Sequence, residues 1–313
     1  FEAMERGELT SVYCIGENPA SSEADAHRAR KLLENLDTLI VQDIFMTRTA
    51  EMADVVLPAA NSAFESEGTV TNSERRVQRV RKALDPPGRA RDDIWIIAQL
   101  AKRLGYDWGD LTSAEAWDEL RSLSPMHAGM SWMRLDELGG IQWPCPSEDH
   151  PGTKFLHGRL WEEDPEKRGP AAPFSVTPFE PPVDELTEEF PLRLTTGRRL
   201  DSYNTGIQSS GYSSPMRRTE TIDLSPEDAE RLGVAEGEIV RVTSRRGSLE
   251  VPVGLDRGLR PGLLFMTMHT PDKVDTNVLT IDATDPKSGT AEFKASAVRI
   301  DKLEAAVSGG GGE

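Results

Sequence analysis

Short apolar runs alternate with helical repeats along the start of the chain. Glycine, proline or polar residues bound each run, and between the first two runs apolar residues recur at three- and four-residue spacing over 26–36. This spacing is typical of an amphipathic helix, and Ser21 or Ser22 is suited to cap it. The pattern predicts this helix, a short helix over 47–53, and strands over 9–15, 38–41 and 55–57.

This alternation of strands and helices predicts a parallel sheet with helices on its faces. Ligands of such sheets bind beyond the carboxyl ends of the strands. Asn18 follows the first predicted strand, and Gln42 and Asp43 end the second. The sequence therefore places three polar side chains where a ligand is expected.

A polar segment and then a basic one follow the third strand. Residues 59–72 show no hydrophobic period and are expected to form a loop, whereas residues 73–84 (SERRVQRVRKAL) alternate valines with five basic residues. The basic run is expected to be a solvated strand edge, the commoner case, or to face ligand phosphates or an acidic partner subunit. Helices are predicted from Asp92 or Asp93 to 104, over 113–123 and over 132–138.

Residues 139–191 differ from both flanks because prolines and acidic residues are dense there. We expect an irregular crossing segment, with residues 158–160 as a possible strand. This segment marks the predicted domain boundary. The expected organisation is a first domain over 1–140, a connection over 141–189, a second domain over 190–306 and a flexible tail over 307–313.

Strand patterns dominate the second half of the chain. Ser225 and Pro226 are suited to open a helix that Gly233 ends, and two strictly alternating runs flank residues 245–247, which predicts a hairpin. One helix among strands joined by long polar loops suggests a small β-barrel. The expected strands are 191–195, 221–224, 238–244, 248–253, 262–268 and 295–300.

The stretch 194–212 (LTTGRRLDSYNTGIQSSGY) is a candidate ligand loop. It leaves a predicted strand, loses every hydrophobic period after Leu200, and offers two arginines among hydroxyl, amide and glycine residues. These groups suit a large polar ligand that carries phosphates, and glycines allow the backbone to approach it closely. On composition alone an ordinary surface loop is the commoner interpretation.

Composition excludes several classes of function. The formal net charge is −17, from 53 acidic and 36 basic residues, which argues against general binding to nucleic acids or anionic membranes. Cys14 and Cys145 form no CxxC or Cys/His cluster, so an iron–sulfur or structural zinc site is not expected here. Two lone cysteines suit a reducing compartment, and neither a membrane span nor a signal-peptide pattern is evident, so we expect a cytoplasmic location.

No familiar catalytic pattern stands out, since GxSxG, P-loop and HExxH motifs are all missing. Four of the five histidines, at 27, 127, 150 and 157, are expected to be structural or exposed. His269 differs because it lies at the end of a predicted strand. The signals in this sequence are therefore signals of binding.

Five segments together resemble the molybdopterin oxidoreductases, and most of all the catalytic (alpha) subunit of formate dehydrogenases. Periplasmic nitrate reductases are similar to a lesser degree. The resemblance covers most of the chain except about 110–185, and corresponds to the C-terminal portion of such subunits. The segments are GENPA at 16–20, VQDIFMTRTAEMADVVLPAA at 41–60, EGTVTNSERRVQ at 67–78, TTGRRLDSYNTGIQSSGY at 195–212 and NVLTIDATDPKSGTAEFK at 277–294.

The resemblance implies a molybdenum or tungsten ion held by two molybdopterin guanine dinucleotides. It also implies half of a parallel-sheet αβα domain, followed by a double-psi-like β-barrel that binds the dinucleotide. Asp43 is suited to accept paired N–H bonds from guanine, and Arg198 or Arg199 to bind phosphate oxygens. The positions that match cofactor contacts are Asn18, Gln42, Asp43, Asp93, Thr196, Gly197, Arg198, Arg199, Leu200, Asp201, Ser202, Tyr203, Asn204, Thr205, His269, Asn277 and Lys294.

Two of these matches have an open alternative. Asp93 lies at a predicted helix start, where an acid is favoured by the helix dipole alone. His269 falls where relatives can carry an aromatic residue.

The resemblance further implies that the catalytic machinery lies upstream of this chain. The family's cysteine or selenocysteine metal ligand, its adjacent histidine, its catalytic arginine and its [4Fe–4S] motif have no match here. We therefore expect a cofactor-binding part of a formate dehydrogenase that is inactive alone and needs the missing half, with iron–sulfur or NAD-linked electron-transfer subunits as partners. The alternatives are a nitrate reductase-like or other molybdopterin reductase, and a non-catalytic cofactor-binding chain.

Overall fold

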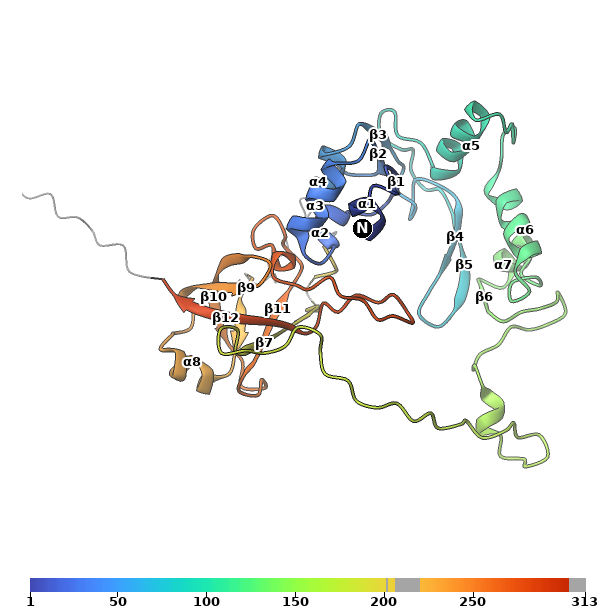
Figure 1. Cartoon of the computed structure of the whole chain (residues 1–313). Helices are drawn as coiled ribbons and strands as arrows, with labels where there is room; N and C mark the ends of the chain where they lie inside the picture. The colour runs from blue at the N-terminus through green and yellow to red at the C-terminus, as the bar shows by residue number, and fades with distance from the viewer. Residues whose placement is uncertain (201, 206–219, 304–313) are drawn as a thin grey trace, which may run out of the picture. The chain divides into compact units, whose positions relative to one another are not determined.

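The computed structural model describes residues 1–200, 202–205 and 220–303 (Figure 1). The chain forms two compact units. Unit 1 comprises Phe1–Val56 and Phe179–Glu313, and unit 2 comprises Leu57–Pro178. The domain limits predicted from the sequence stay predictions.

The N-terminal part of unit 1 is built on parallel strands. β1 pairs in parallel with β2, with Ser11 opposite Thr38 and Ile15 opposite Gln42, and β3 completes the order β1-β2-β3. Buried aliphatic residues of the sheet and helices, among them Leu33 and Val41, form its core. The elements are α1 (Glu2–Glu5), β1 (Ser11–Ile15), α2 (Pro19–Ser22), α3 (Ala26–Glu34), β2 (Thr38–Asp43), α4 (Arg48–Glu51) and β3 (Val55–Pro58).

The cap predicted for the first helix is wrong. Pro19 opens an extra turn of helix, α2, so that Ser21 lies within a helix instead of before one. Asp25 caps α3 instead, and its carboxylate accepts the Arg28 N–H at 3.3 Å. Proline is favoured at the first helical position, which explains why the helical conformation begins earlier than the periodicity suggests.

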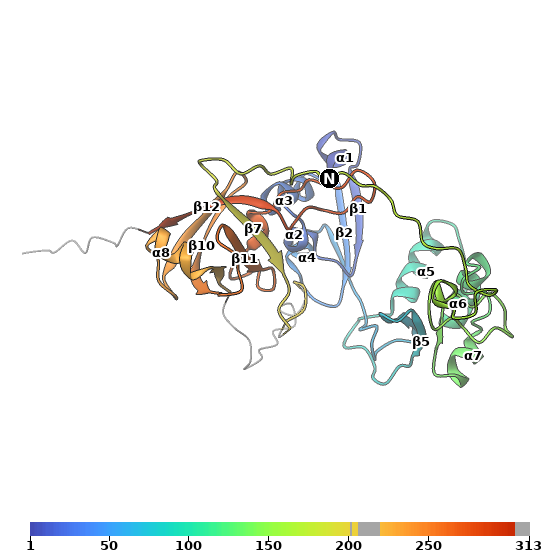
Figure 2. The same cartoon turned by 90° about the horizontal axis from the view of Figure 1, so that it is seen from below.

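The C-terminal part of unit 1 is a closed barrel, of which Figure 2 labels β7, β10, β11 and β12. The strand order is β10-β8-β11-β7-β12-β9. The pairs β11–β7 and β10–β8 are parallel, and the others are antiparallel. Together with the parallel β1–β2 pair, the barrel confirms the predicted fold class. The strands are β7 (Leu192–Gly197), β8 (Ile222–Leu224), β9 (Ile239–Ser244), β10 (Ser248–Leu255), β11 (Leu263–Thr267) and β12 (Ser296–Lys302).

Local signals explain helix α8 (Pro226–Leu232) of the barrel part. The Ser225 hydroxyl accepts the Asp228 N–H at 3.1 Å, and Gly233 ends the helix in the left-handed region with φ of 67°. Both features match the sequence prediction, because caps depend on neighbours only. Alternate residues of the strands, such as Leu192 and Leu194, fill the barrel interior.

Unit 2 combines a small antiparallel sheet with three helices and a 3-10 turn. The basic strand β5 pairs with β4 on one side and β6 on the other, so the predicted edge strand is in fact central. Residues 68–71 and 158–160 also differ from expectation, since the first are a strand and the second helical. The elements are β4 (Gly68–Thr71), β5 (Arg76–Val80), α5 (Asp93–Arg103), α6 (Ser113–Leu123), α7 (Trp132–Glu137), β6 (Ile141–Gln142) and η1 (Gly158–Trp161).

Within the described ranges, no helix combines the length and apolar character needed to cross a bilayer.

Candidate functional site

The loop after β1 is tied to α4 through Asn18. The Asn18 side-chain oxygen accepts the Thr49 N–H at 3.2 Å and the Thr49 hydroxyl at 2.8 Å. The same Thr49 hydroxyl oxygen accepts the Ala20 N–H at 3.0 Å. Asn18 therefore lies at the carboxyl end of β1, as expected, with its carbonyl group already engaged inside the protein.

Gln42 and Asp43 lie at the carboxyl end of β2 but in different surroundings. Gln42 is fully buried, and its side-chain oxygen accepts a hydrogen bond from the Tyr13 hydroxyl. Asp43 is half-buried, and one of its carboxylate oxygens accepts the Phe45 N–H at 2.9 Å. Of the two, Asp43 has the more accessible side chain, and its carboxylate offers further acceptor sites.

The loop after β7 is organised around His269, which follows β11. His269 Nε2 accepts the Arg199 N–H at 2.9 Å, and His269 Nδ1 contacts the Asn204 carbonyl oxygen at 2.8 Å. Since one ring nitrogen accepts and the other faces an acceptor, the proton belongs on Nδ1. His269 is 3% exposed, so a buried imidazole holds both ends of the segment 199–204.

The two adjacent arginines of this loop differ in their partners. The Arg199 guanidinium pairs with Asp223, which is 8% exposed, and donates to the Thr221 hydroxyl at 3.3 Å. Arg198 is exposed and lies over the Tyr203 ring, with its guanidinium carbon 4.8 Å from the ring centroid. Within the described ranges, no carboxylate pairs with Arg198. Arg199 is therefore fixed to the barrel, whereas Arg198 presents its charge at the surface.

The end of β7, from which this loop leaves, is packed closely against its neighbours. The Thr196 hydroxyl donates to the Phe293 carbonyl at 2.9 Å, and Lys294 Nζ donates to the Thr196 carbonyl at 2.6 Å. A Cβ added at Gly197 would lie 2.7 Å from Phe265 Cε2, so only glycine fits there without displacing the ring. The predicted residues Thr196, Gly197 and Lys294 are thus brought together.

The remaining predicted residues are scattered more widely. Leu200 is fully exposed, and Ser202 donates its N–H to the Arg199 carbonyl at 3.2 Å. Thr205 is half-buried, and Asp201 lies outside the described residues. Asp93 is the first residue of α5 in unit 2, where Asp92 provides the cap by accepting the Trp95 N–H at 2.9 Å.

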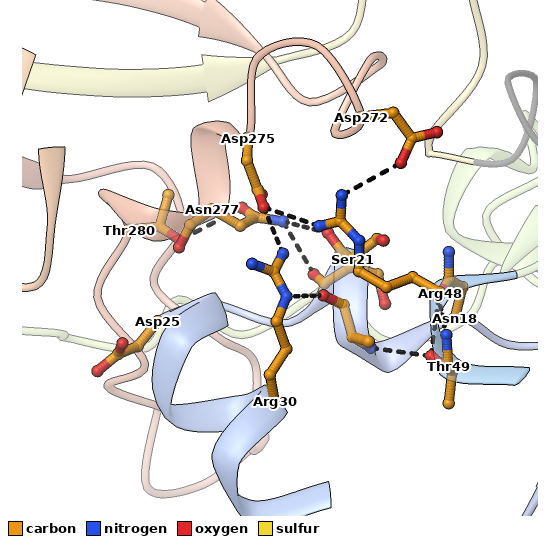
Figure 3. A network of polar contacts seen from close by, with 12 residues as sticks. Asn18, Ser21, Asp25, Arg30, Arg48, Thr49, Asp272, Asp275, Asn277 and Thr280 are labelled. Atoms are coloured by element: carbon orange, nitrogen blue, oxygen red, sulfur yellow. Dashed lines mark hydrogen bonds and ion pairs between the residues drawn. The ribbon is translucent and has the colours of Figure 1, made fainter. Parts of the chain in front are cut away.

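Asn277 joins the barrel to the N-terminal part of unit 1. Its side-chain nitrogen donates to the Ser21 carbonyl at 3.0 Å and to the Ser22 carbonyl at 3.3 Å. Its side-chain oxygen accepts from the Thr280 hydroxyl at 3.3 Å. This residue lies in the one-turn helix η2 (Thr276–Val278) and is 3% exposed. Figure 3 shows Asn277 between the two parts of the unit.

Sequence reasoning missed the charged residues around this junction. Arg30 and Arg48 both bind Asp275, which lies 245 and 227 positions further along the chain. No local pattern predicts such a contact, because an isolated arginine in a helix is normally expected to be a solvated side chain. Across the residues that the structure describes, no group of three or more His, Cys, Asp or Glu side chains is arranged to hold a metal ion.

Two family descriptions match this chain, one from the N-terminal part of unit 1 into unit 2 and the other over the barrel. Residues 1–103 match "Molybdopterin oxidoreductase", and residues 192–297 match "Molydopterin dinucleotide binding domain". The second match coincides with the barrel and with the loops around His269.

Two curated relatives and one solved structure illustrate the similarity. The chain is 41% identical to "F420-dependent formate dehydrogenase 2 subunit alpha" of Methanococcus maripaludis, over 93% of this chain and 43% of the relative. It is 38% identical to the "Assimilatory nitrate reductase catalytic subunit" of Bacillus subtilis, over 96% of this chain and 43% of the relative. Acetylene hydratase from Pelobacter acetylenicus shares the fold, with a TM-score of 0.70 at 22% identity, over 96% of this chain and 46% of that one. The chain spans less than half the length of each.

Proposed function

We propose that this chain, which belongs to the molybdopterin oxidoreductase family, contributes a wall of the site that binds molybdopterin guanine dinucleotide. The observation that carries the proposal is the hydrogen-bonded arrangement in which His269 holds the backbone of Arg199 and Asn204. A segment held at residues 199 and 204 presents its donors with little loss of conformational freedom on binding. Arg198 and the hydroxyl and amide groups of residues 196–205 would then face the phosphates and pterins.

The chemistry of the donor set supports this fit. Arg198 has no carboxylate partner within the described ranges and can donate to phosphate oxygens. The Thr270 hydroxyl, next to His269, is buried and has no hydrogen-bond partner among the described residues, which leaves a donor for a bound group. Gly197 keeps the backbone clear of a side chain at the end of β7, where the loop begins.

The guanine end is assigned to the strand ends of the N-terminal part. Asp43 has a half-buried carboxylate at the carboxyl end of β2, where a parallel sheet binds its ligands. The carboxylate would accept N–H bonds from the base, while Asn18 would hold the neighbouring loop against α4. The buried Gln42 side chain accepts from the Tyr13 hydroxyl on β1 and would fix the end of β2, next to Asp43.

For the complete enzyme we propose oxidation of formate to CO2, with release of two electrons and a proton. The bound cofactor would supply two-electron chemistry at its molybdenum or tungsten ion. The metal ligand, the substrate-binding residues and the iron–sulfur clusters would come from parts of the enzyme outside this sequence, and electrons would pass to a partner subunit. This assignment rests on the similarity to formate dehydrogenase alpha subunits. Nitrate reduction is the second candidate, because a nitrate reductase is nearly as similar.

Cofactor analysis of the full-length enzyme tests the binding proposal. Asp43→Asn keeps an oxygen for the Phe45 N–H but removes the carboxylate charge. We expect it to lower guanine dinucleotide content about tenfold, as for loss of one charge-assisted pair. Asp37→Asn is the matched control, because Asp37 is exposed and directly precedes the first residue of the same strand, at the end opposite Asp43. Equal content in the two variants would contradict the assignment.

Steady-state assays of the purified full-length enzyme separate the two substrates. We expect reduction of an artificial acceptor with formate, and no oxidation of a reduced viologen with nitrate. The reverse result would overturn the formate assignment while leaving the cofactor assignment intact. Metal analysis of the same preparation distinguishes molybdenum from tungsten.

A further inference from the structure

Two arginines from the N-terminal part of unit 1 meet one carboxylate from the barrel part (Figure 3). Arg30 lies on α3, Arg48 is the first residue of α4, and Asp275 immediately precedes η2. Both guanidinium groups bind the same oxygen, Asp275 Oδ2, and the distance from Arg48 Nη1 is 3.0 Å. We call these three residues the arginine clamp.

Burial distinguishes the clamp from an ordinary surface ion pair. The side chains of Asp275, Arg30 and Arg48 are 18%, 20% and 29% exposed. Arg48 also contacts Asp272 at 3.2 Å, but Asp272 is 67% exposed. Exposed pairs contribute little to stability, whereas removing one partner of a largely desolvated pair leaves the other charge uncompensated.

No residue of the clamp is itself a predicted cofactor contact, but each is joined to one. Arg48 precedes Thr49, which binds Asn18. Arg30 Nε donates to the Ala20 carbonyl at 2.8 Å, in the turn of helix that follows Asn18.

Asp275, the clamp residue from the barrel part, is likewise joined to predicted cofactor contacts. Asp275 lies two residues before Asn277, which donates to the Ser21 carbonyl. In the other direction the chain runs back to His269, which holds the backbone of Arg199. The Thr276 hydroxyl donates to the Thr267 carbonyl at 2.6 Å and so closes this segment onto β11. The clamp therefore connects the segment between His269 and Asn277, which these contacts hold at both ends, to the loop that carries Asn18.

We propose that Arg30, Arg48 and Asp275 are positioning residues. They couple the loop after β1, which carries Asn18, to the segment after β11, which carries His269, so that the two are preorganised together. The identity of the ligand in this inference rests on the proposed function, whereas the coupling of the two segments does not. A clamp that fixes both loops before binding removes part of the entropic cost of ordering them around a large ligand. Breaking it loosens both loops, including the one that the substitution does not touch.

Hydrogen exchange of the full-length protein tests the coupling. Asp275→Asn keeps the size of the side chain and removes its charge. We expect faster exchange in peptides covering 18–22 and 47–52, on the other side of the clamp, as well as in 269–280. Asp272→Asn is the matched control, since it makes the same change in the same segment at an exposed position. Unchanged exchange at 18–22 in Asp275→Asn would overturn the proposal.

Two further variants separate positioning from general destabilisation. Arg48→Lys keeps a charge that can reach Asp275 and should retain most of the protection that Arg48→Gln loses. Arg28→Gln breaks pairs with Glu5 and with Asp282. The Asp282 pair also joins α3 to the barrel part, but Asp282 is 40% exposed, against 18% for Asp275. If Arg28→Gln raises exchange at 18–22 as much as Arg48→Gln does, the clamp has no special role.

Cofactor content of the same variants links the coupling to binding. We expect Asp275→Asn to lower guanine dinucleotide content about threefold or more, and Asp272→Asn to leave it unchanged. If wild-type protein contains no such cofactor, the proposed function fails while the exchange experiment still decides the coupling. If cofactor is present and Asp275→Asn leaves both content and exchange unchanged, the coupling fails alone.

Discussion

The basic strand β5 of unit 2 and the loop after β7 of unit 1 both look like anion-binding segments in the sequence, yet the arginines of β5 and Arg198 of the loop are in opposite situations. On β5 the arginines meet protein acceptors: Arg79 pairs with Glu67 and Asp136, and Arg76 with Glu74. In the loop, Arg198 meets an aromatic ring and no carboxylate among the described residues.

The difference arises mainly from protein acceptors that lie further along the chain. Asp136, on α7, receives Arg79 at 3.1 Å and also binds Arg81. Arg75 donates to the main-chain carbonyls of Trp143, Thr153 and Lys154. A cationic run in a sequence therefore does not indicate an anionic ligand until its intramolecular partners are known.

Two further arginines are neutralised by a carboxylate that is almost completely buried, and their site gives the largest expected effect. Arg245 and Arg246, in the hairpin turn, both bind Asp184, which is 3% exposed and also accepts the Ala297 N–H at 2.8 Å. Asp184→Ala should destabilise the barrel by about 3–5 kcal/mol, because it leaves both guanidinium groups without their carboxylate. Hydrogen exchange of β12 amides measures this, with the exposed neighbour substitution Glu185→Ala as control. A loss below that of the control would show that these charges are not coupled to folding.

Acid should weaken the barrel through the same residue. Burial acts to raise the pKa of Asp184, but hydrogen bonds from Arg246 and the Ala297 N–H and the nearby arginine charges outweigh it, so that the pKa is lowered. The stabilisation is therefore fully present above the pKa of an unfolded aspartate, about 3.9, and is lost as pH falls toward the lower pKa of the folded state. Barrel stability measured from pH 7 downward should fall less steeply below that point in Asp184→Asn than in the wild type. Parallel curves for the two proteins would contradict this.

The next effect compares Arg79 on β5 with Arg81, which directly follows this strand. The Arg79 side chain is 12% exposed, and its guanidinium carbon lies 4.2 Å from the Trp132 ring centroid. Arg79→Ala should destabilise unit 2 by about 2 kcal/mol through loss of the ion pairs and the cation–π contact. Arg81 is 61% exposed and shares Asp136, so Arg81→Ala should cost only about 0–1 kcal/mol. Exchange rates of β4 and β5 amides compare the two, and similar losses would contradict the role assigned to burial.

The sequence predicted those features that depend on neighbouring residues. The parallel strands, the hairpin around residues 245–247 and the cap at Ser225 all follow from local periodicity or turn chemistry. The central position of β5 could not be predicted, because its partner β6 has only two residues and no period. The predicted domain limits and cofactor contacts remain predictions.

The polar junctions of the candidate site were equally inaccessible to pattern analysis. His269 was singled out by its position at a strand end, but its contacts with Arg199 and Asn204 span 70 and 65 positions. Asp275 and its two arginines gave no signal at all. Long-range ion pairs depend on how the chain folds back on itself, and hydrophobic periodicity carries no information about which charges then meet.

The smallest expected change in stability belongs to Arg198, and it provides the decisive test of the comparison. Because Arg198 is exposed and has no carboxylate partner among the described residues, Arg198→Gln should change the free energy of unfolding by no more than about 0.5 kcal/mol. Its charge is instead expected to act on the ligand, so cofactor content of the full-length enzyme should fall about tenfold, as for loss of one charge-assisted phosphate contact. Arg81→Gln is the matched control, since it removes an exposed arginine whose carboxylate partner is already present in the protein. If Arg81→Gln lowers cofactor content as much as Arg198→Gln does, overall charge accounts for the loss, and the distinction between neutralised and presented arginines fails.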